Sequence, residues 1–489
     1  MNECDRSTCP CLIHSRKRRY ADAFRIVQGD TLHDDEPSIV LAPAFWSDFR
    51  RRYWNRKPVA FRKPAVRDFP TAKESLEAIV AASDELRRGG DVLLRLYLEH
   101  VSEGESIESR YFASAVEFPK DHLPTREDFS LEAYARRAEQ RFHGHRFGLF
   151  INDVQAHHFR HWLRMSGFLA GLYAAIGVPG GGVQSAIHFG TYRHTPFGIH
   201  KDEAHVFTFV VEGTKTMLVW PLESFSRKTH PEVPPDPEHE EAKIAIRDRA
   251  EYRRLMRSAV RLRGNPGDII YWPPSYWHRS EPVPAPTCTI ALLLKPTGWE
   301  FLRSNPEPLR NAEASTLMPP RQALPGKKVY RLPKRVSDAI REKRLEPARQ
   351  RSGNGAMRSW MSFATSRGFV TPAPLDRDAT LKGVSAVRAN PRRPIVRARV
   401  DSRHVLVACN GWTQRILAHP RLLELIELLN SGSAVNLRNA KRDFSGRATR
   451  RGVTYEVNRN YVRDLVLVLL RWRAVSPCRP EAVDPHTPR

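Results

Sequence analysis

The chain has 489 residues, 41% of them hydrophobic, and a formal net charge of +25 at pH 7. This length allows about two to four domains with real hydrophobic cores, and six cysteines in so long a chain exclude a disulfide-stapled scaffold. We find neither a secretory signal nor an apolar run of membrane-spanning length, so we expect a soluble cytoplasmic protein that makes no use of a membrane.

The positive charge is concentrated in the C-terminal part. Residues 301–489 hold 37 basic and 15 acidic residues, whereas residues 1–300 hold 42 and 39. An excess of this kind favours an acidic partner, such as a nucleic acid, a ribosomal surface or an acidic peptide. The arginines are spread out rather than gathered in one tract, so solubility, or a host with arginine-rich codon usage, is an alternative explanation.

Residues 1–38 are expected to form a polar tail. Cys4, Cys9 and Cys11 lie in it with a spacing that matches no standard zinc knuckle, so reduced cysteines in a disordered segment are favoured over a metal site. The next predicted elements are an aromatic-rich helix and a short strand within Phe45–Pro64, followed by a helix over 72–88 and a strand within 91–101. A helix over 131–142 and a strand over 147–153 come next. An apolar helix then begins at about 157 and is stopped by Gly and Pro residues.

From about Val183 to Leu294 the pattern changes to short alternating or apolar runs separated by Pro, Gly and Asp. This pattern is typical of β-barrels and double-sheet jelly rolls. A charged, Pro-rich and partly helical insertion over 224–262 interrupts it, in a loop where substrate-gating elements often lie. We therefore predict an α+β chain with a jelly-roll core and flanking helices.

Two further segments are expected after this core. Residues 301–394 are predicted to be a basic Pro/Arg-rich linker with some helix over 335–344. Residues 395–489 are predicted to form a helical, winged-helix-like module. Its helices lie within His419–Gly432 and Val457–Val475, and the second carries Arg459, Arg463, Arg471 and Arg473.

A metal site is predicted around 200. His200 and Asp202 are two residues apart on a strand, so their side chains point to the same face. His278 follows the strand Gly267–Trp272 and is the candidate third ligand. Two histidines and one carboxylate form a facial triad that leaves positions on Fe(II) open for a 2-oxo acid and O2.

Lys215 is expected on the second strand of a hairpin that begins near Val206 and turns at 212–214. A lone cation facing into a barrel needs an anionic partner, and the far carboxylate of 2-oxoglutarate suits it. Thr208 or Tyr192 could add hydrogen bonds. Each feature alone has a structural explanation, since His278 could be a core histidine and Lys215 a solvated turn residue. Their combination favours the metal site.

The order and spacing of His200, Asp202, Lys215 and His278 in "YWPPSYWHRSEP" resemble the JmjC-type cupin-like Fe(II)/2-oxoglutarate oxygenases, in particular their protein-hydroxylase, bacterial ribosomal-oxygenase-like branch. The entry segment Phe45–Pro64 is also similar. The resemblance covers about residues 38–300 and implies a catalytic domain over 39–300 with a double-stranded β-helix core. It also implies Fe(II), 2-oxoglutarate and O2 as cofactors, with a winged-helix-like module after the catalytic domain.

Four functions remain open from the sequence. The first is hydroxylation of an amino-acid side chain in a protein or peptide, which could be acidic or ribosomal, with nucleic-acid contact through the basic C-terminal part. The second is the same chemistry on a small molecule or free amino acid in natural-product tailoring. The third is demethylation of lysine or arginine, and the fourth is a metal- or nucleic-acid-binding cupin without oxygenase activity. The C-terminal module could also form a homodimer.

Overall fold

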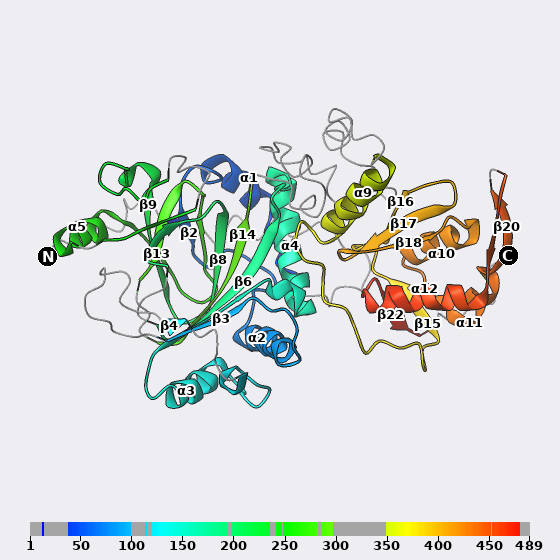
Figure 1. Cartoon of the computed structure of the whole chain (residues 1–489), viewed down its shortest axis with the longest axis horizontal. Coiled ribbons are helices and arrows are strands. Elements are labelled where there is room, and N and C mark those ends of the chain that lie inside the picture. Colours follow the sequence, from blue (N-terminus) through cyan, green and yellow to red (C-terminus); the bar gives the residue numbers. More distant parts are fainter. Residues whose placement is uncertain are drawn as a thin grey trace. The chain divides into compact units, whose positions relative to one another are not determined.

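The computed structural model describes residues 12–13, 38–98, 113–114, 120–192, 197–234, 241–246, 248–281, 285–296, 349–450 and 452–479. The chain separates into two compact units, Met1–Pro296 and Thr297–Arg489. Figure 1 shows the strands of the first unit in blue to green and the second unit in yellow to red.

Two sheets form the centre of the first unit. In the described residues the larger sheet has the strand order β1 (Leu12–Ile13), β2 (Val59–Phe61), β12 (Ile269–Trp272), β8 (His205–Glu212), β14 (Thr287–Leu294), β6 (Val183–Gly190), β5 (Phe147–Asn152), β3 (Leu94–Leu98) and β4 (Ala113–Ser114). The smaller sheet has the order β10 (Ala242–Ile244), β7 (Ile199–Lys201), β13 (Tyr276–Ser280), β9 (Lys215–Pro221) and β11 (Val260–Gly264).

The two sheets share one hydrophobic core. Alternate residues of their strands point into it, as the period of two along a strand requires. Val206 and Val210 come from β8, Met217 and Val219 from β9, and Ile270 from β12. Nearly all strand pairs are antiparallel, and β1 with β2 is a parallel pair. Two facing antiparallel sheets with flanking helices confirm the predicted α+β jelly-roll fold class.

Helices cover the outer side of the larger sheet. The α-helices in the described residues of this unit are α1 (Pro43–Arg52), α2 (Ala72–Arg87), α3 (Leu131–Arg141), α4 (Phe159–Ile176) and α5 (Arg249–Ser258). Phe168 of α4 lies against Phe207 and Phe209 of β8, with ring centroids 5.1 and 4.9 Å apart. Helix α2 begins at a capping box formed by Thr71 and Glu74. The predicted helices and strands between 43 and 176 are thus confirmed.

The prediction that the strands between Val206 and Val219 pair as a hairpin is wrong. Strand β8 lies in the larger sheet between β12 and β14, and β9 lies in the smaller sheet between β13 and β11. The turn at 212–214 therefore carries the chain from one sheet to the other. Both strands are apolar on both faces, so their residue pattern does not say which neighbour each one pairs with.

The predicted insertion over 224–262 is part of the smaller sheet at two places. Strand β10 pairs with β7, which carries His200, and β11 pairs with β9 along Val260–Gly264. Strand β11 alternates exposed arginines with a buried leucine. Because of these charges, its sequence looks like a loop although one face of the strand is buried. The described part between these strands contains α5, capped by Asp248, and fits the expected helical insertion.

The N-terminal tail also departs from expectation. Leu12–Ile13 forms β1 and pairs with Ala60 and Phe61 of β2, because two apolar residues in a polar segment can add to an open sheet edge. The three early cysteines lie outside the described residues. No helix in the described parts of the chain is long and apolar enough to cross a membrane.

The second unit has its own core. Its described elements are α9 (Arg349–Thr365), β15 (Ala386–Ala389), β16 (Val396–Arg399), β17 (His404–Cys409), β18 (Trp412–Leu417), α10 (Pro420–Asn430), β19 (Val435–Asn436), α11 (Leu437–Asp443), β20 (Gly446–Arg450), β21 (Val453–Val457), α12 (Arg459–Arg471) and β22 (Val475–Cys478). Leu422 and Ile426 of α10 pack in this core with Val462 and Leu469 of α12.

The predicted helices α10 and α12 are confirmed, and β20 and β21 form a two-stranded hairpin between α11 and α12, as a winged-helix-like module would have. The unit has more β-structure than the helical module predicted. Helix α9 and strand β15 lie within the predicted linker of 301–394, because Trp360 and Met361 provide buried residues among many polar ones. The predicted helix over 335–344 lies outside the described residues.

Candidate metal centre

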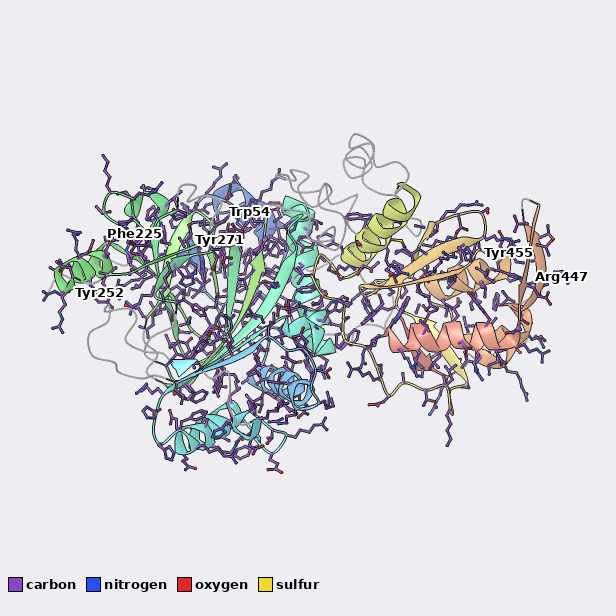
Figure 2. All side chains as sticks on the ribbon, in the orientation of Figure 1. Trp54, Phe225, Tyr252, Tyr271, Arg447 and Tyr455 are labelled. Atoms are coloured by element: carbon purple, nitrogen blue, oxygen red, sulfur yellow. The ribbon has the colours of Figure 1, made fainter. Side chains whose placement is uncertain are left out.

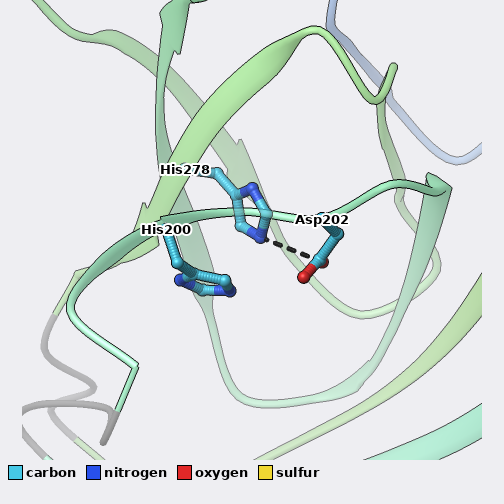
Figure 3. A group of neighbouring side chains, drawn as sticks. All are labelled: His200, Asp202 and His278. Carbon is cyan, nitrogen blue, oxygen red and sulfur yellow. Dashed lines mark ion pairs between the residues drawn. The ribbon is translucent and has the colours of Figure 1, made fainter. Parts of the chain in front are cut away.

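The three predicted ligands come together where β7 and β13 run side by side. His200 of β7 is paired directly with His278 of β13, and the two imidazole rings are 4.1 Å apart. Asp202 follows β7, and its Oδ2 lies 3.4 Å from His278 Nε2 (Figure 3). One donor atom from each residue lies within 4.8 Å of the others, so the three side chains could hold one metal ion.

Backbone carbonyls orient both imidazoles. His200 Nδ1 lies 3.1 Å from Gly198 O, and His278 Nδ1 lies 3.4 Å from Tyr276 O. A proton on Nδ1 satisfies each of these contacts and leaves the Nε2 lone pair for a ligand bond. The contacts therefore select, for both rings, the tautomer that a metal requires.

The ionisation states also suit a cation. Burial, and next the neighbouring His278 ring, lower the pKa of His200 to about 4, so this imidazole is neutral near pH 7. Burial opposes ionisation of Asp202, but the hydrogen bond and charge of His278 outweigh it and hold the pKa of this carboxyl well below its ordinary value. The centre therefore offers the neutral nitrogen of His200 and the anionic oxygen of Asp202 as donors.

Lys215 lies at the start of β9 and is 4% exposed. Its Nζ donates a hydrogen bond of 2.9 Å to Tyr192 Oη and lies 5.2 Å from the centre of the same ring. The structure thus brings two of the predicted co-substrate residues together. Thr208 is buried on β8, but within the described residues no hydrogen bond joins it to Lys215 or Tyr192.

A row of aromatic side chains lies between Lys215 and the metal centre, and the sequence did not predict it. Phe150 lies 5.8 Å from Tyr192 and 5.6 Å from Phe197, and Phe197 lies 5.5 Å from His200, measured between ring centroids. Tyr97 packs on Phe150 and Phe197. The alternation along β3 and β5 indicates that these residues share a face, but not that this face meets β7.

Polar residues complete the interior. His188 of β6 is paired with Phe150 and Thr289 in one row across the larger sheet. Burial, then the charges of Lys215 and Arg95, lower the pKa of His188 to about 3. Arg95 is exposed and lies 6.0 Å from the centre of the Phe197 ring. The side of this interior between β3 and β7 therefore carries a cation at its rim.

His205, close to the ligands in sequence, belongs to another layer. Its ring stacks on Trp54 at 3.7 Å, and its Nδ1 pairs with Tyr271 Oη at 3.0 Å. Figure 2 labels Trp54 and Tyr271, which lie close together on the α1 side of the larger sheet. His205 therefore packs with Trp54 and Tyr271 and is not one of the candidate ligands.

No protein-family profile and no curated protein matches the chain. Solved structures do resemble it. A structure of the Escherichia coli ribosomal oxygenase YcfD has 17% sequence identity and a TM-score of 0.44, and the match covers 90% of this chain and 100% of that chain. The same protein in complex with cobalt and 2-oxoglutarate has 16% identity and a TM-score of 0.42, over 90% and 99% of the two chains. At these values the activity of this chain has to be inferred from its own residues.

Proposed function

We propose that the chain is an Fe(II)- and 2-oxoglutarate-dependent oxygenase that hydroxylates an amino-acid side chain in a protein or peptide. The observation that carries this proposal is the combination of three converging ligands, His200, Asp202 and His278, with the buried cation Lys215 in the same interior. A two-histidine, one-carboxylate set with open positions is typical of non-haem iron oxygenases.

The residues fit these cofactors. His200, Asp202 and His278 would hold Fe(II), and Lys215, assisted by Tyr192, would hold the far carboxylate of 2-oxoglutarate. Thr208 remains a further candidate for that contact. With 2-oxoglutarate and O2, bound iron supplies the oxidising power for hydroxylation. The protein itself would orient the ligands, exclude water and place the target C–H bond next to the metal.

Two buried polar atoms support a polar co-substrate. Trp272 Nε1 and Thr289 Oγ1 have no hydrogen-bond partner among the described residues. The Trp272 ring lies 4.9 Å from that of His278, and Thr289 is paired with His188 on the interior row. Because buried polar groups normally find partners, a bound co-substrate or water is expected to serve these atoms.

The rim favours hydroxylation over demethylation. A methylated lysine or arginine substrate would bring a positive charge past Arg95, which lies over Phe197 next to His200. A neutral or acidic segment would meet no such repulsion. This supports an acidic peptide, which could belong to a ribosomal protein. Nucleic-acid contact by the basic C-terminal part and a homodimer remain predictions.

The test is a turnover assay with matched peptides. The full chain is incubated with Fe(II), 2-oxoglutarate and either an acidic or a basic peptide pool, or free amino acids, and succinate and a mass gain of one oxygen are measured. We expect oxygen incorporation in the acidic pool, and none with His278→Ala. Turnover on free amino acids alone would instead support the small-molecule alternative. A metal-bound protein without any 2-oxoglutarate turnover would support the non-oxygenase cupin.

A further inference from the structure

The described parts of residues 222–259 cover the outer face of the smaller sheet, and we call them the outer segment. Successive side chains along a strand point to opposite faces, so Ile199 and Trp277, which precede the two histidine ligands, point away from the metal centre. Both pack in a hydrophobic cluster that is separate from the core between the sheets. The outer segment contributes to this cluster the buried residues Phe225, Val233, Ile244, Ile246 and Leu255. It therefore packs behind the two strands that carry His200 and His278.

The outer segment is attached to the strand that carries His200. Its strand β10 pairs with β7, and Lys243 is the residue directly opposite His200. Strand β7 has only three residues and lies between β10 and β13. So short a strand makes few ladder hydrogen bonds with either neighbour. The position of His200 therefore depends on the outer segment as well as on β13.

Two tryptophans fasten the outer segment to the other strands of this sheet. Trp277 of β13 donates a hydrogen bond of 3.2 Å from Nε1 to Leu222 O, at the start of the segment. Trp220 of β9 donates one of 2.9 Å from Nε1 to Leu255 O, in the last turns of α5. Both indole N–H groups thus find the partner that a buried donor needs, and both ends of the segment are held against the sheet.

Arg279 joins the strand of His278 to α5. It directly follows His278 on β13, points to the outer face and is 3% exposed. Its Nη1 donates a hydrogen bond to Tyr252 Oη and lies 3.3 Å from Met256 Sδ, and its Cζ lies 5.3 Å from the centre of the Tyr252 ring. Tyr252, labelled in Figure 2, and Met256 are four residues apart and lie on one face of α5. One side chain of β13 therefore contacts two successive turns of the helix.

We propose that Arg279 is a positioning residue for the metal centre. By holding β13 against α5, it fixes His278 relative to His200, whose strand pairs with β10 of the same segment. Ligands that are held in place before the metal arrives bind it more tightly, and residues behind the ligands contribute to that affinity. The inference rests on the metal centre of the proposed function and is independent of 2-oxoglutarate and of the substrate.

The experiment titrates the metal-free full chain with Co(II), a coloured substitute for Fe(II), and follows its visible d–d absorption. The intensity gives the dissociation constant, and the band shape reports the coordination geometry. The first test variant is Arg279→Ala. Arg279→Lys keeps a cation against the Tyr252 ring, and Tyr252→Phe keeps the ring and removes the acceptor oxygen. The matched control is Arg263→Ala, which removes an exposed cation from β11 of the same sheet.

We expect Arg279→Ala to change the band shape and to raise the dissociation constant for Co(II) by about tenfold, as substitutions behind metal ligands do. Arg279→Lys should recover most of this affinity. Tyr252→Phe should raise the constant by about threefold, as the loss of one hydrogen bond would. The control should match wild type. If Arg279→Ala does not fold, the lysine and Tyr252→Phe variants decide.

Urea unfolding of the metal-free variants separates positioning from stability, and circular dichroism checks that each variant is folded in the titration. If Arg279 only stabilises the fold, Arg279→Ala and Tyr252→Phe will lower the free energy of unfolding but leave the Co(II) affinity and band shape unchanged. That result, or an equal change in Arg263→Ala, would overturn the proposal. A wild-type chain that binds no Co(II) would contradict the metal centre itself and this inference with it, so the two failures are distinguishable.

Discussion

Lys215 is a buried cation whose described hydrogen-bond partner is a neutral phenol. A buried charge without an opposite charge is costly, and tyrosine can supply only part of the compensation. Lys215 lies in the same interior as the three candidate ligands, connected to His200 by the rings of Tyr192, Phe150 and Phe197. This arrangement favours an anion that reaches from the metal to Lys215.

We therefore predict that Lys215→Ala raises the dissociation constant for 2-oxoglutarate by about 10- to 100-fold, since hydrogen bonds to charged groups contribute about 1.5–3 kcal/mol. Tyr192→Phe keeps the ring under the ammonium group and should raise it by no more than about tenfold. Isothermal titration of the Mn(II)-loaded chain measures both. Arg263→Ala, which removes an exposed cation from β11 of the same sheet, serves as the control. An unchanged affinity in Lys215→Ala would contradict the assigned role.

The three candidate metal ligands could be predicted from the sequence because each lies next to a recognisable local pattern. His200 and Asp202 are two residues apart, and His278 follows the predicted strand Gly267–Trp272, which ends at two prolines. Phe150 and Arg95 were not accessible, because only the pairing of β3 with β5 brings them to the same interior. The roles of all these residues stay predictions until they are measured.

The turn at 212–214 is the element that separates Lys215 from the larger sheet. Gly213 has a φ of +71°, and a Cβ added there would lie 2.5 Å from Pro286 O. Both the backbone conformation and the contact with a neighbouring chain segment therefore require glycine at this position.

We predict that Gly213→Ala lowers the free energy of unfolding by about 2–4 kcal/mol, because left-handed strain and a steric overlap add. Gly89→Ala separates the two causes, since Gly89 has a φ of +82° but no atom within 4 Å of an added Cβ. It should cost about 1 kcal/mol. Urea unfolding of both variants makes the comparison. Equal losses would show that the contact with Pro286 contributes nothing.

Element types were predicted better than element partners. The helices over 72–87, 131–141, 159–176, 420–430 and 459–471 follow from their apolar spacing, caps and stops. The supposed hairpin of β8 and β9 failed because two strands that are buried on both faces carry no information about their neighbours. Strand β11 was missed because arginine occupies its exposed positions.

Buried neutral histidines make the whole molecule sensitive to acid. Burial, then nearby His158 and Arg164, lower the pKa of His161 to about 3, and burial lowers that of His205 to about 3. An unfolded histidine has a pKa of about 6.5. Between about pH 6.5 and 3 the unfolded chain therefore binds more protons than the folded chain, so stability is complete above pH 6.5 and is lost as the pH falls.

We predict that His205→Phe, which keeps a ring against Trp54, makes stability less dependent on pH. Between pH 5.5 and 4.5 the slope should fall by one proton, or about 1.4 kcal/mol per pH unit. Urea unfolding of wild type and variant at each pH provides the measurement. Parallel curves would show that His205 is protonated equally in the folded and unfolded chain.

We propose that one iron site and one 2-oxoglutarate site share the interior of the first unit. Anaerobic addition of Fe(II) and then 2-oxoglutarate to metal-free protein, followed by visible absorption, tests this directly. We expect a weak metal-to-ligand charge-transfer band that is absent in His200→Ala and weakened in Lys215→Ala. Folded protein that binds Fe(II) but develops no band with 2-oxoglutarate would contradict it, and a cupin without oxygenase activity would then be the better account.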